Sequence, residues 1–122
     1  MTGSKIRARR SFIFTPGLKP EMFPKAIASG ADIVCIELED GIAPKDKKEA
    51  REKALSIFQN QTIPENIEVI LRINSIRSLF GLDDIRAILS TDFPPPAIML
   101  PKVNDAEEVK ICLLYTSDAA DE

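Results

Sequence analysis

At 122 residues, 44% of them hydrophobic and 29% charged, the chain has the size and composition of one globular domain. Its formal net charge of -3 gives no indication of nucleic acid or an anionic membrane as a partner, and no apolar stretch approaches the roughly 20 residues that a membrane helix needs. The basic N-terminal segment lacks the apolar core of a secretory signal, so we expect a cytoplasmic protein.

The first third of the chain alternates strand and helix patterns. A short β-rich run at 11–17 ends in proline and glycine, and the following residues 20–30 fit a helix that stops at Gly30. Pro24 has to lie in the first turn of that helix. The apolar run within 31–40 predicts a second strand, which delivers carboxylates at its end.

The middle of the chain repeats this alternation. Residues 44–58 open with Pro44 and predict a helix with a solvated charged side and a buried face of Ala50, Ala54, Ile57 and Phe58. Residues 67–74 predict a third apolar strand. Residues 79–89 then predict a helix with its apolar positions at Leu82, Ile85, Ile88 and Leu89.

A fourth strand and helix are predicted near the end. The strand is short, Ala97 to Leu100, and lies between prolines. A helix begins within 104–110, with Asn104 or Asp105 as its N-cap. The order βαβαβαβα, with nearly continuous apolar strands, predicts a parallel sheet covered by helices.

Polar residues follow the predicted strands at their C-terminal ends. Both common parallel architectures, the closed barrel and the open doubly wound sheet, bind ligands at that edge. We therefore expect four side chains to converge on one face: Glu39, Asp40, Arg72 and Lys102.

This set suits an anionic substrate. The planar fork of Arg72 can meet a carboxylate bidentately, while Glu39 and Asp40 can orient a divalent cation or its waters. The alternatives are that the acids cap a helix or line a solvated loop, that Arg72 pairs with them structurally, and that Lys102 is an exposed turn residue. The spacing alone leaves both interpretations open, because structural ion pairs imitate functional sites.

The available side chains restrict the chemistry further. The chain has two cysteines, Cys35 and Cys112, and no histidine, so Ser–His pairs, Cys–His pairs and histidine metal sites are excluded from it. We expect both cysteines to be free thiols, with Cys35 as a small buried hydrophobe. Any chemistry must therefore use carboxylates, lysine, arginine or a bound ion.

The last residues do not continue the pattern. The stretch CLLYTSDAADE has no lysine or arginine, and it resembles translated adaptor sequence appended to assembled reading frames. We therefore expect residues 111–122 to be a non-native tail.

Three blocks carry a family resemblance, which covers about residues 9–110: RSFIFTPGLKPEMFPKAIASGADIVCIELEDGIAPKDKKEAR, LRIN and IMLPKVNDAEEV. In this order and spacing they resemble the N-terminal part of the citrate lyase beta subunit and malyl-CoA lyase group, within the HpcH/HpaI aldolase/citrate lyase family. The resemblance implies an α/β fold, a TIM (β/α)8 barrel, of which this chain holds about the first four βα units. Residues 1–110 are then expected to be the N-terminal part of a TIM-barrel lyase domain.

The resemblance also implies an activity. Members of the group cleave or form a carbon–carbon bond in 3-hydroxyacyl thioesters such as citryl-, malyl- or citramalyl-thioesters, giving an acyl thioester and a 2-oxo acid. Mg²⁺ chelates the oxo acid or the matching hydroxy acid, and the thioester half becomes an enolate. Coenzyme A is the expected substrate carrier, and the full-length protein is expected to be a homo-oligomer.

Residue roles follow from the same resemblance. Arg72 matches the arginine that grips the substrate carboxylate, and Glu39 and Asp40 match the acidic pair that acts beside the metal through its waters. Lys102 matches a strand-end lysine of the catalytic set.

Contacts with coenzyme A are implied at three further positions, Phe14, Lys19 and Lys25. Their alternative roles are a core aromatic and two solvated lysines.

One departure from the family is expected to matter. Relatives are more than twice as long, and their direct Mg²⁺ ligands, a glutamate and an aspartate, lie on later strands, so no direct metal ligand is expected here. Four strands leave two open sheet edges. We therefore expect the chain alone to be inactive, and to dimerise through its edges, aggregate or stay partly unfolded.

Two other functions compete. A receiver-type signalling domain has a similar length and an acidic Mg²⁺ pocket, but it needs an aspartate after its third strand, where this chain has Arg72 and Asn74. A non-catalytic remnant would bind a thioester or a partner chain without turnover.

Overall fold

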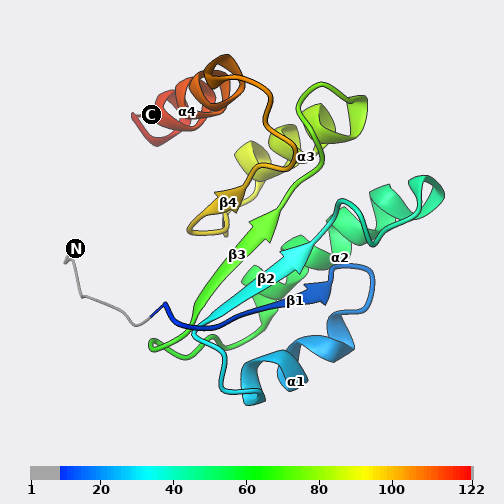
Figure 1. Ribbon diagram of the computed structural model, residues 1–122, viewed down its shortest axis with the longest axis vertical. Coiled ribbons are helices and arrows are strands. Elements are labelled where there is room, and N and C mark those ends of the chain that lie inside the picture. The colour runs from blue at the N-terminus through cyan, green and yellow to red at the C-terminus, as the bar shows by residue number, and fades with distance from the viewer. Residues whose placement is uncertain (1–8, 122) are drawn as a thin grey trace.

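The structure is a computed structural model that describes residues 9–121, and the side chains of residues 9–113. Its centre is a four-stranded sheet in which all neighbouring strands run parallel (Figure 1). The strands are β1 (Phe12–Pro16), β2 (Ile33–Glu37), β3 (Glu68–Arg72) and β4 (Ile98–Met99). The predicted parallel sheet is confirmed.

A helix follows each strand, as the alternating pattern predicts. The helices are α1 (Phe23–Ala28), α2 (Lys47–Asn60), α3 (Leu79–Ser90) and α4 (Ala106–Asp121), with 3-10 turns η1 (Pro20–Met22) before α1 and η2 (Pro44–Asp46) before α2. Among the described residues, no helix combines the length and apolar character that a bilayer crossing requires.

Local sequence explains where these helices begin and end. Proline opens η1 and η2, where its fixed φ suits a first turn. The Ser78 hydroxyl accepts the N–H of Gly81 at 3.1 Å, and Asp105 accepts the N–H of Glu107 at 3.0 Å. The predicted N-cap at Asp105 is confirmed. Gly30, with φ at 86°, follows α1 at the predicted stop.

The strand order β1-β2-β3-β4 bears on the rival function. A receiver-type sheet places its first strand between the second and third, so that the order is 2-1-3-4-5. Here successive strands are neighbours throughout, as in the wall of a barrel. The receiver interpretation is wrong.

The two faces of the sheet differ. On one face, alternate strand residues such as Val34, Ile36 and Leu71 pack with Ala54 and Ile57 of α2 in a single hydrophobic core. On the other face, Phe12 and Phe14 are exposed and meet edge to face, with ring centroids 4.9 Å apart. Helices therefore cover one face of the sheet, whereas the other face leaves the two aromatic rings of β1 exposed.

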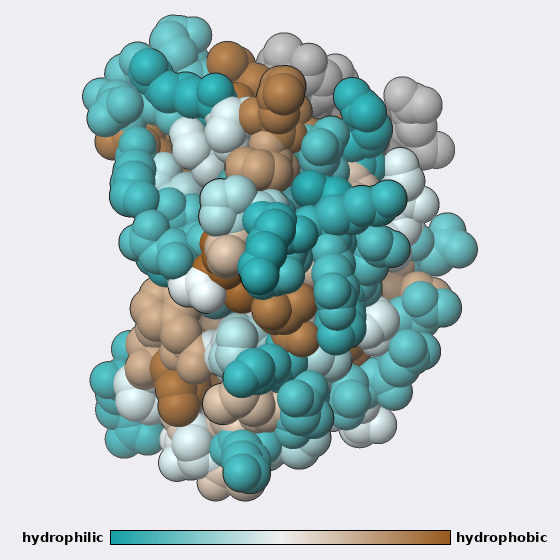
Figure 2. Space-filling model, turned by 90° about the vertical axis from the view of Figure 1, so that its right-hand side faces the viewer, coloured by the Kyte–Doolittle hydropathy of each residue, from teal (hydrophilic) through white to brown (hydrophobic). Residues whose placement is uncertain are grey.

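One helix face differs in part from the prediction. The predicted apolar positions Ile85 and Ile88 of α3 are buried, whereas Leu82 and Leu89 are exposed. Gly81 and Asp84 take their place on the buried face, and a pattern of apolar residues alone does not predict a buried aspartate. Hydrophobic residues do reach the surface among hydrophilic ones on the side that Figure 2 shows.

The proposed tail boundary is not settled by the fold. Helix α4 is continuous from Ala106 to Asp121 and so crosses residues 110 and 111. The side chains after residue 113 lie outside the described ones. A non-native tail at 111–122 stays a prediction.

Candidate functional site

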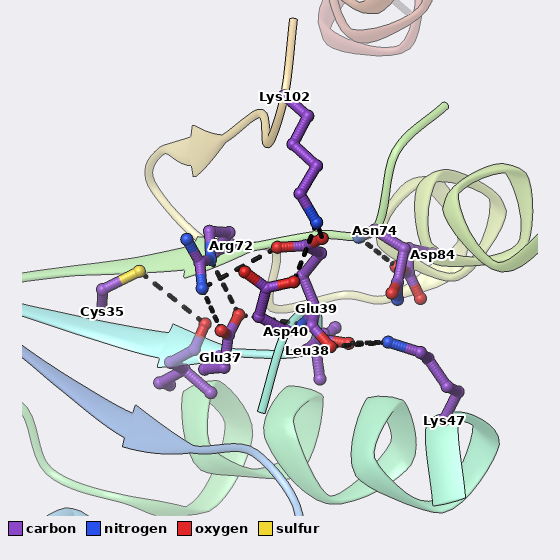
Figure 3. Close-up of polar contacts among 11 residues, drawn as sticks. Cys35, Glu37, Leu38, Glu39, Asp40, Lys47, Arg72, Asn74, Asp84 and Lys102 are labelled. Atoms are coloured by element: carbon purple, nitrogen blue, oxygen red, sulfur yellow. Dashed lines mark hydrogen bonds and ion pairs between the residues drawn. The ribbon is translucent and has the colours of Figure 1, made fainter. Parts of the chain in front are cut away.

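The strand ends gather the predicted polar residues at one edge of the sheet (Figure 3). Glu37 ends β2 and is paired in register with Arg72, which ends β3 and is paired with Met99 of β4. Glu39 and Asp40 follow β2 directly. Because parallel strands end at the same edge, these residues meet although they are distant in sequence.

Arg72 is held by a carboxylate that the sequence interpretation left out. Its Nε donates to Oε1 of Glu37 at 2.8 Å, and its Nη2 donates to Oε2 of the same residue. The guanidinium carbon also lies 4.6 Å from the ring centroid of Phe14. Arg72 is thus fixed by a bidentate pair and an aromatic ring.

Burial and charge act together at this pair. Burial raises the pKa of Glu37, but the Arg72 guanidinium and the N–H groups of Glu39 and Gly41 outweigh it, so that this pKa lies below its ordinary value. The hydrogen bond to Glu37 in turn raises the pKa of Arg72. Both groups are charged at neutral pH.

Cys35 lies on the same strand as Glu37 and is fully buried. Burial, together with the charge of Glu37, raises the pKa of its thiol to about 12. The prediction of a small buried hydrophobe is confirmed. The raised pKa also disfavours the thiolate, which is the reactive form of cysteine. Cys112 is also buried, and burial raises the pKa of its thiol.

Lys102 reaches across to the acidic pair. Its Nζ lies 2.7 Å from Oε2 of Glu39 and 2.8 Å from Oδ1 of Asp40. Hydrogen bonds to these two carboxylates raise the pKa of Lys102, and the hydrogen bond from Lys102 lowers the pKa of Asp40. Lys102 is therefore an ammonium group at neutral pH, and Asp40 is a carboxylate.

Lys102 also has an unusual backbone. Its φ of 47° is the one positive value among the non-glycine residues that the structure describes. Such strain is concentrated at functional sites and turns. The predicted convergence of Glu39, Asp40, Arg72 and Lys102 is confirmed, whereas their chemical roles stay predictions.

Glu39 is the most enclosed of the acidic pair. Its Oε1 is buried, has no hydrogen-bond partner among the described residues, and lies 3.8 Å from Nη2 of Arg72. Its backbone N–H donates to Oε1 of Glu37 at 2.9 Å, and its carbonyl accepts from Nζ of Lys47 at 2.7 Å. The peptide groups of Glu39 are thus held on both sides.

Lys47 corrects the prediction of a solvated charged side on α2. The residue is buried, and its Nζ also donates to the carbonyl of Leu38 at 3.1 Å. Burial lowers the pKa of Lys47. The signal was available, because Lys47 precedes Ala50 by three positions and Ala54 by seven, which puts it on the buried face.

A second buried group supports the end of β3. Asp84 of α3 accepts the backbone N–H of Asn74 at 2.9 Å, the Asn74 side-chain amide at 2.8 Å and Nε of Arg51 at 2.8 Å. The side chain of Asp84 is 0% exposed. Sequence reasoning missed it, although it shares a helix face with Ile85 and Ile88.

The three predicted coenzyme A contacts lie in different places. Phe14 lies beside Arg72, as described above. Lys19 lies in the loop after β1 and Lys25 on α1, and both side chains are exposed. Their interaction with coenzyme A stays a prediction.

The chemistry of the side chains decides whether magnesium fits this edge of the sheet. Among the side chains that the structure describes, those of residues 9–113, no group of three or more Asp, Glu, His or Cys is arranged to hold a metal ion. The carboxylates that face one another, Glu39 and Asp40, are bound by Lys102. The described residues therefore do not by themselves fit a magnesium centre.

Comparison with known proteins identifies the family. The sequence model of the HpcH/HpaI aldolase/citrate lyase family matches residues 10–120, which is most of the chain. The chain belongs to this family.

Two curated lyases of this family show the extent of the similarity. Citrate lyase subunit beta of Escherichia coli (strain K12) is 31% identical over 105 residues, which cover 86% of this chain and 34% of that protein. L-malyl-CoA/beta-methylmalyl-CoA lyase of Rhodobacter capsulatus is 34% identical over 104 residues, which cover 84% of this chain and 32% of that protein. The chain spans about a third of the length of these relatives.

A solved structure supports the fold. CitE from Mycobacterium tuberculosis, in complex with magnesium, acetoacetate and coenzyme A, matches with a TM-score of 0.68 and 31% identity, over 86% of this chain and 38% of that one. The α/β prediction is confirmed. The four strand–helix units match part of a TIM-barrel-type citrate lyase subunit.

Proposed function

We propose that this family member contributes the carboxylate-binding part of the active site of a Mg²⁺-dependent carbon–carbon lyase acting on 3-hydroxyacyl thioesters. One observation carries the proposal: Arg72 is fixed beside Glu39, Asp40 and Lys102 at the C-terminal edge of a parallel sheet. Citryl-, malyl- and citramalyl-thioesters are the proposed substrates, in line with the activities named for the relatives.

In the cleavage direction, the proposed reaction breaks one carbon–carbon bond of the substrate. The substrate hydroxyl gives its proton to solvent water, and the bond breaks between the hydroxyl-bearing carbon and the carbon next to the thioester. The electron pair of that bond passes into the enolate of the acyl thioester, which then takes up a proton from water, so that no net proton is gained or lost. The products are an acyl thioester and a 2-oxo acid.

The charged groups have distinct roles in this proposal. Arg72 binds the substrate carboxylate through its planar guanidinium. Lys102 acts as a positive charge near the reacting oxygen atoms, because its raised pKa keeps the group protonated and makes it a poor proton donor. Glu39 and Asp40, which accept hydrogen bonds from Lys102, would also orient the water molecules of a bound Mg²⁺.

Magnesium and coenzyme A belong to the proposal through the solved relative that contains both. No residue of this chain is assigned as a direct ligand of the ion, since the described residues form no such group. Phe14, Lys19 and Lys25 are the proposed contacts of coenzyme A. A homo-oligomeric full-length protein and a cytoplasmic location are also proposed.

We further propose that the 122 residues alone bind a 2-oxo acid without turning over a thioester. The reason is that Arg72, the proposed carboxylate-binding residue, is held in place, whereas the residues that the structure describes form no metal centre. This chain would then behave as the non-catalytic binding protein that the sequence also allows.

Isothermal titration of oxaloacetate into the chain tests the proposal. Wild type is expected to bind, and Arg72→Lys is expected to lose roughly tenfold or more in affinity because lysine lacks the bidentate fork. The control is Arg86→Lys, at an exposed position of α3, which should bind like wild type. Circular dichroism checks that each variant is folded.

A turnover assay completes the test. With malyl-, citramalyl- or citryl-CoA and Mg²⁺, the chain should release no acyl-CoA product. Folded wild type that binds no oxaloacetate, or Arg72→Lys that binds as tightly as wild type, would refute the binding role. Product release at an enzymatic rate would refute the proposed inactivity.

A further inference from the structure

The guanidinium of Arg72 presents its donors unequally. It carries five N–H donors, one on Nε and two on each terminal nitrogen. Glu37 accepts from Nε and from Nη2, so it covers the side edge of the group. Among the described residues, none accepts a hydrogen bond from Nη1. The donors that stay available are on the end edge, formed by Nη1 and Nη2.

The surroundings prevent Arg72 from exchanging one edge for the other. Phe14 lies against the guanidinium, whose carbon is 4.6 Å from the ring centroid. Both partners of the ion pair are largely buried, with side-chain exposures of 20% for Arg72 and 9% for Glu37. A bidentate pair in such surroundings is shielded from water and is costly to break.

We infer that Glu37 is a positioning residue, which holds Arg72 so that a substrate carboxylate meets only its Nη1–Nη2 edge. The inference rests on the proposed function for the identity of the ligand, a 2-oxo acid that accepts two parallel hydrogen bonds through its carboxylate. Glu37 does not touch the ligand in this arrangement. It acts through the arginine.

The same carboxylate also sets the distance between the arginine and the acidic pair. Oε1 of Glu37 accepts both Nε of Arg72 and the backbone N–H of Glu39. A change at Glu37 therefore alters Arg72 and Glu39 together. In addition, the negative charge of Glu37 partly neutralises the positive charge of Arg72. Anions that cannot form the bidentate contact are therefore attracted less strongly.

Nuclear magnetic resonance of the ¹⁵N-labelled 122-residue chain can test this inference without a ligand. The Nε–H signal of Arg72, identified by its loss in Arg72→Lys, should exchange slowly with water. Glu37→Gln should shift this signal and speed its exchange roughly tenfold, since a neutral amide offers one acceptor in place of two charged ones. Glu68→Gln is the matched control, because Glu68 pairs with Arg9 on the same sheet.

Titration with oxaloacetate then tests whether the ligand binds at the Nη1–Nη2 edge of Arg72. Binding is followed through the backbone amides of Glu39 and Lys102. In wild type the Nε–H signal of Arg72 should stay protected when oxaloacetate binds, and Glu37→Gln should weaken binding roughly tenfold through lost orientation. The Glu68→Gln control should bind like wild type. If Glu37→Gln does not fold, Glu37→Asp, which keeps the charge but shortens the reach, should show the same faster exchange.

The outcomes separate the two proposals. An Arg72 Nε–H signal that is unchanged by both Glu37 variants, or that loses protection when oxaloacetate binds, would overturn the positioning role. Wild type that does not bind oxaloacetate would refute the proposed function, while the exchange rates would still decide whether Glu37 fixes Arg72.

Discussion

The two ends of the sheet each carry an arginine–glutamate pair, yet the pairs lie in different surroundings. At the N-terminal end, Arg9 and Glu68 meet at 2.8 Å, with side-chain exposures of 64% and 21%. At the C-terminal end, Arg72 and Glu37 are far less exposed and also contact an aromatic ring. Glu68 and Arg72 lie on the same face of β3, because they are four residues apart on one strand.

The two pairs have the same residue types, so the difference in burial must determine how much each pair stabilises the fold and how firmly it fixes its side chains. An exposed pair is screened by water and salt and contributes about 0–1 kcal/mol to stability. A buried pair with additional hydrogen bonds fixes its side chains, and removing one partner leaves a buried charge. The C-terminal end is therefore the one that can orient a ligand.

The largest effect on the free energy of unfolding is expected at Asp84, which forms the most deeply buried of these ion pairs. Asp84→Asn should lower the free energy of unfolding by about 3 kcal/mol, because Arg51 would keep a buried charge without its carboxylate. Asp83→Asn is the matched neighbour: Asp83 is half-exposed and lies 4.0 Å from the same arginine, so its loss should cost less than about 0.5 kcal/mol. Equilibrium denaturation measures both. Equal losses would show that burial does not separate these pairs.

A smaller effect is expected from the two glutamates of the opening comparison. Glu37→Gln should lower the free energy of unfolding by about 1–3 kcal/mol at neutral pH, because hydrogen bonds to a charged acceptor are lost. Glu68→Gln should cost less than about 1 kcal/mol. Denaturation of the two variants under identical conditions measures the difference. If Glu68→Gln loses as much stability as Glu37→Gln, the comparison between the two pairs fails.

Acid should remove the effect of Glu37→Gln. The folded protein lowers the pKa of Glu37 below its ordinary 4.5, so the carboxylate stabilises the fold above that pH. This stability is lost as the pH falls through the lower pKa of the folded state, where Glu37 becomes neutral like glutamine. A wild-type advantage that persists in strong acid would contradict this assignment.

Much of this molecule follows from sequence patterns. Alternating strands and amphipathic helices predict the parallel sheet, and the shared edge of parallel strands predicts that Arg72 meets Glu39, Asp40 and Lys102. These inferences succeed because they depend on the spacing of apolar residues and on where each strand ends, and the local sequence specifies both.

The supporting residues could not be predicted in the same way. Pattern reasoning assigns charged residues such as Lys47 and Asp84 to the surface, since burying a charge without a partner is costly. Their partners are backbone groups and an arginine from other elements, which become visible only in three dimensions. Glu37 was overlooked because its role depends on Arg72, which lies 35 residues away in the chain.

The smallest effect on stability is expected at Lys102, which belongs to the functional end but is exposed. Lys102→Gly should barely change the thermal unfolding midpoint, because the lost ion pairs are solvated and glycine accepts the φ of 47° without strain. It should nevertheless raise the pKa of Asp40 toward its ordinary value, since the hydrogen bond from Lys102 lowers it. A carboxyl-detected titration measures this change, with Lys45→Gly as the control at an exposed lysine. A pKa of Asp40 that stays low in Lys102→Gly would contradict the prediction. It would show that positive charges other than Lys102 lower this pKa.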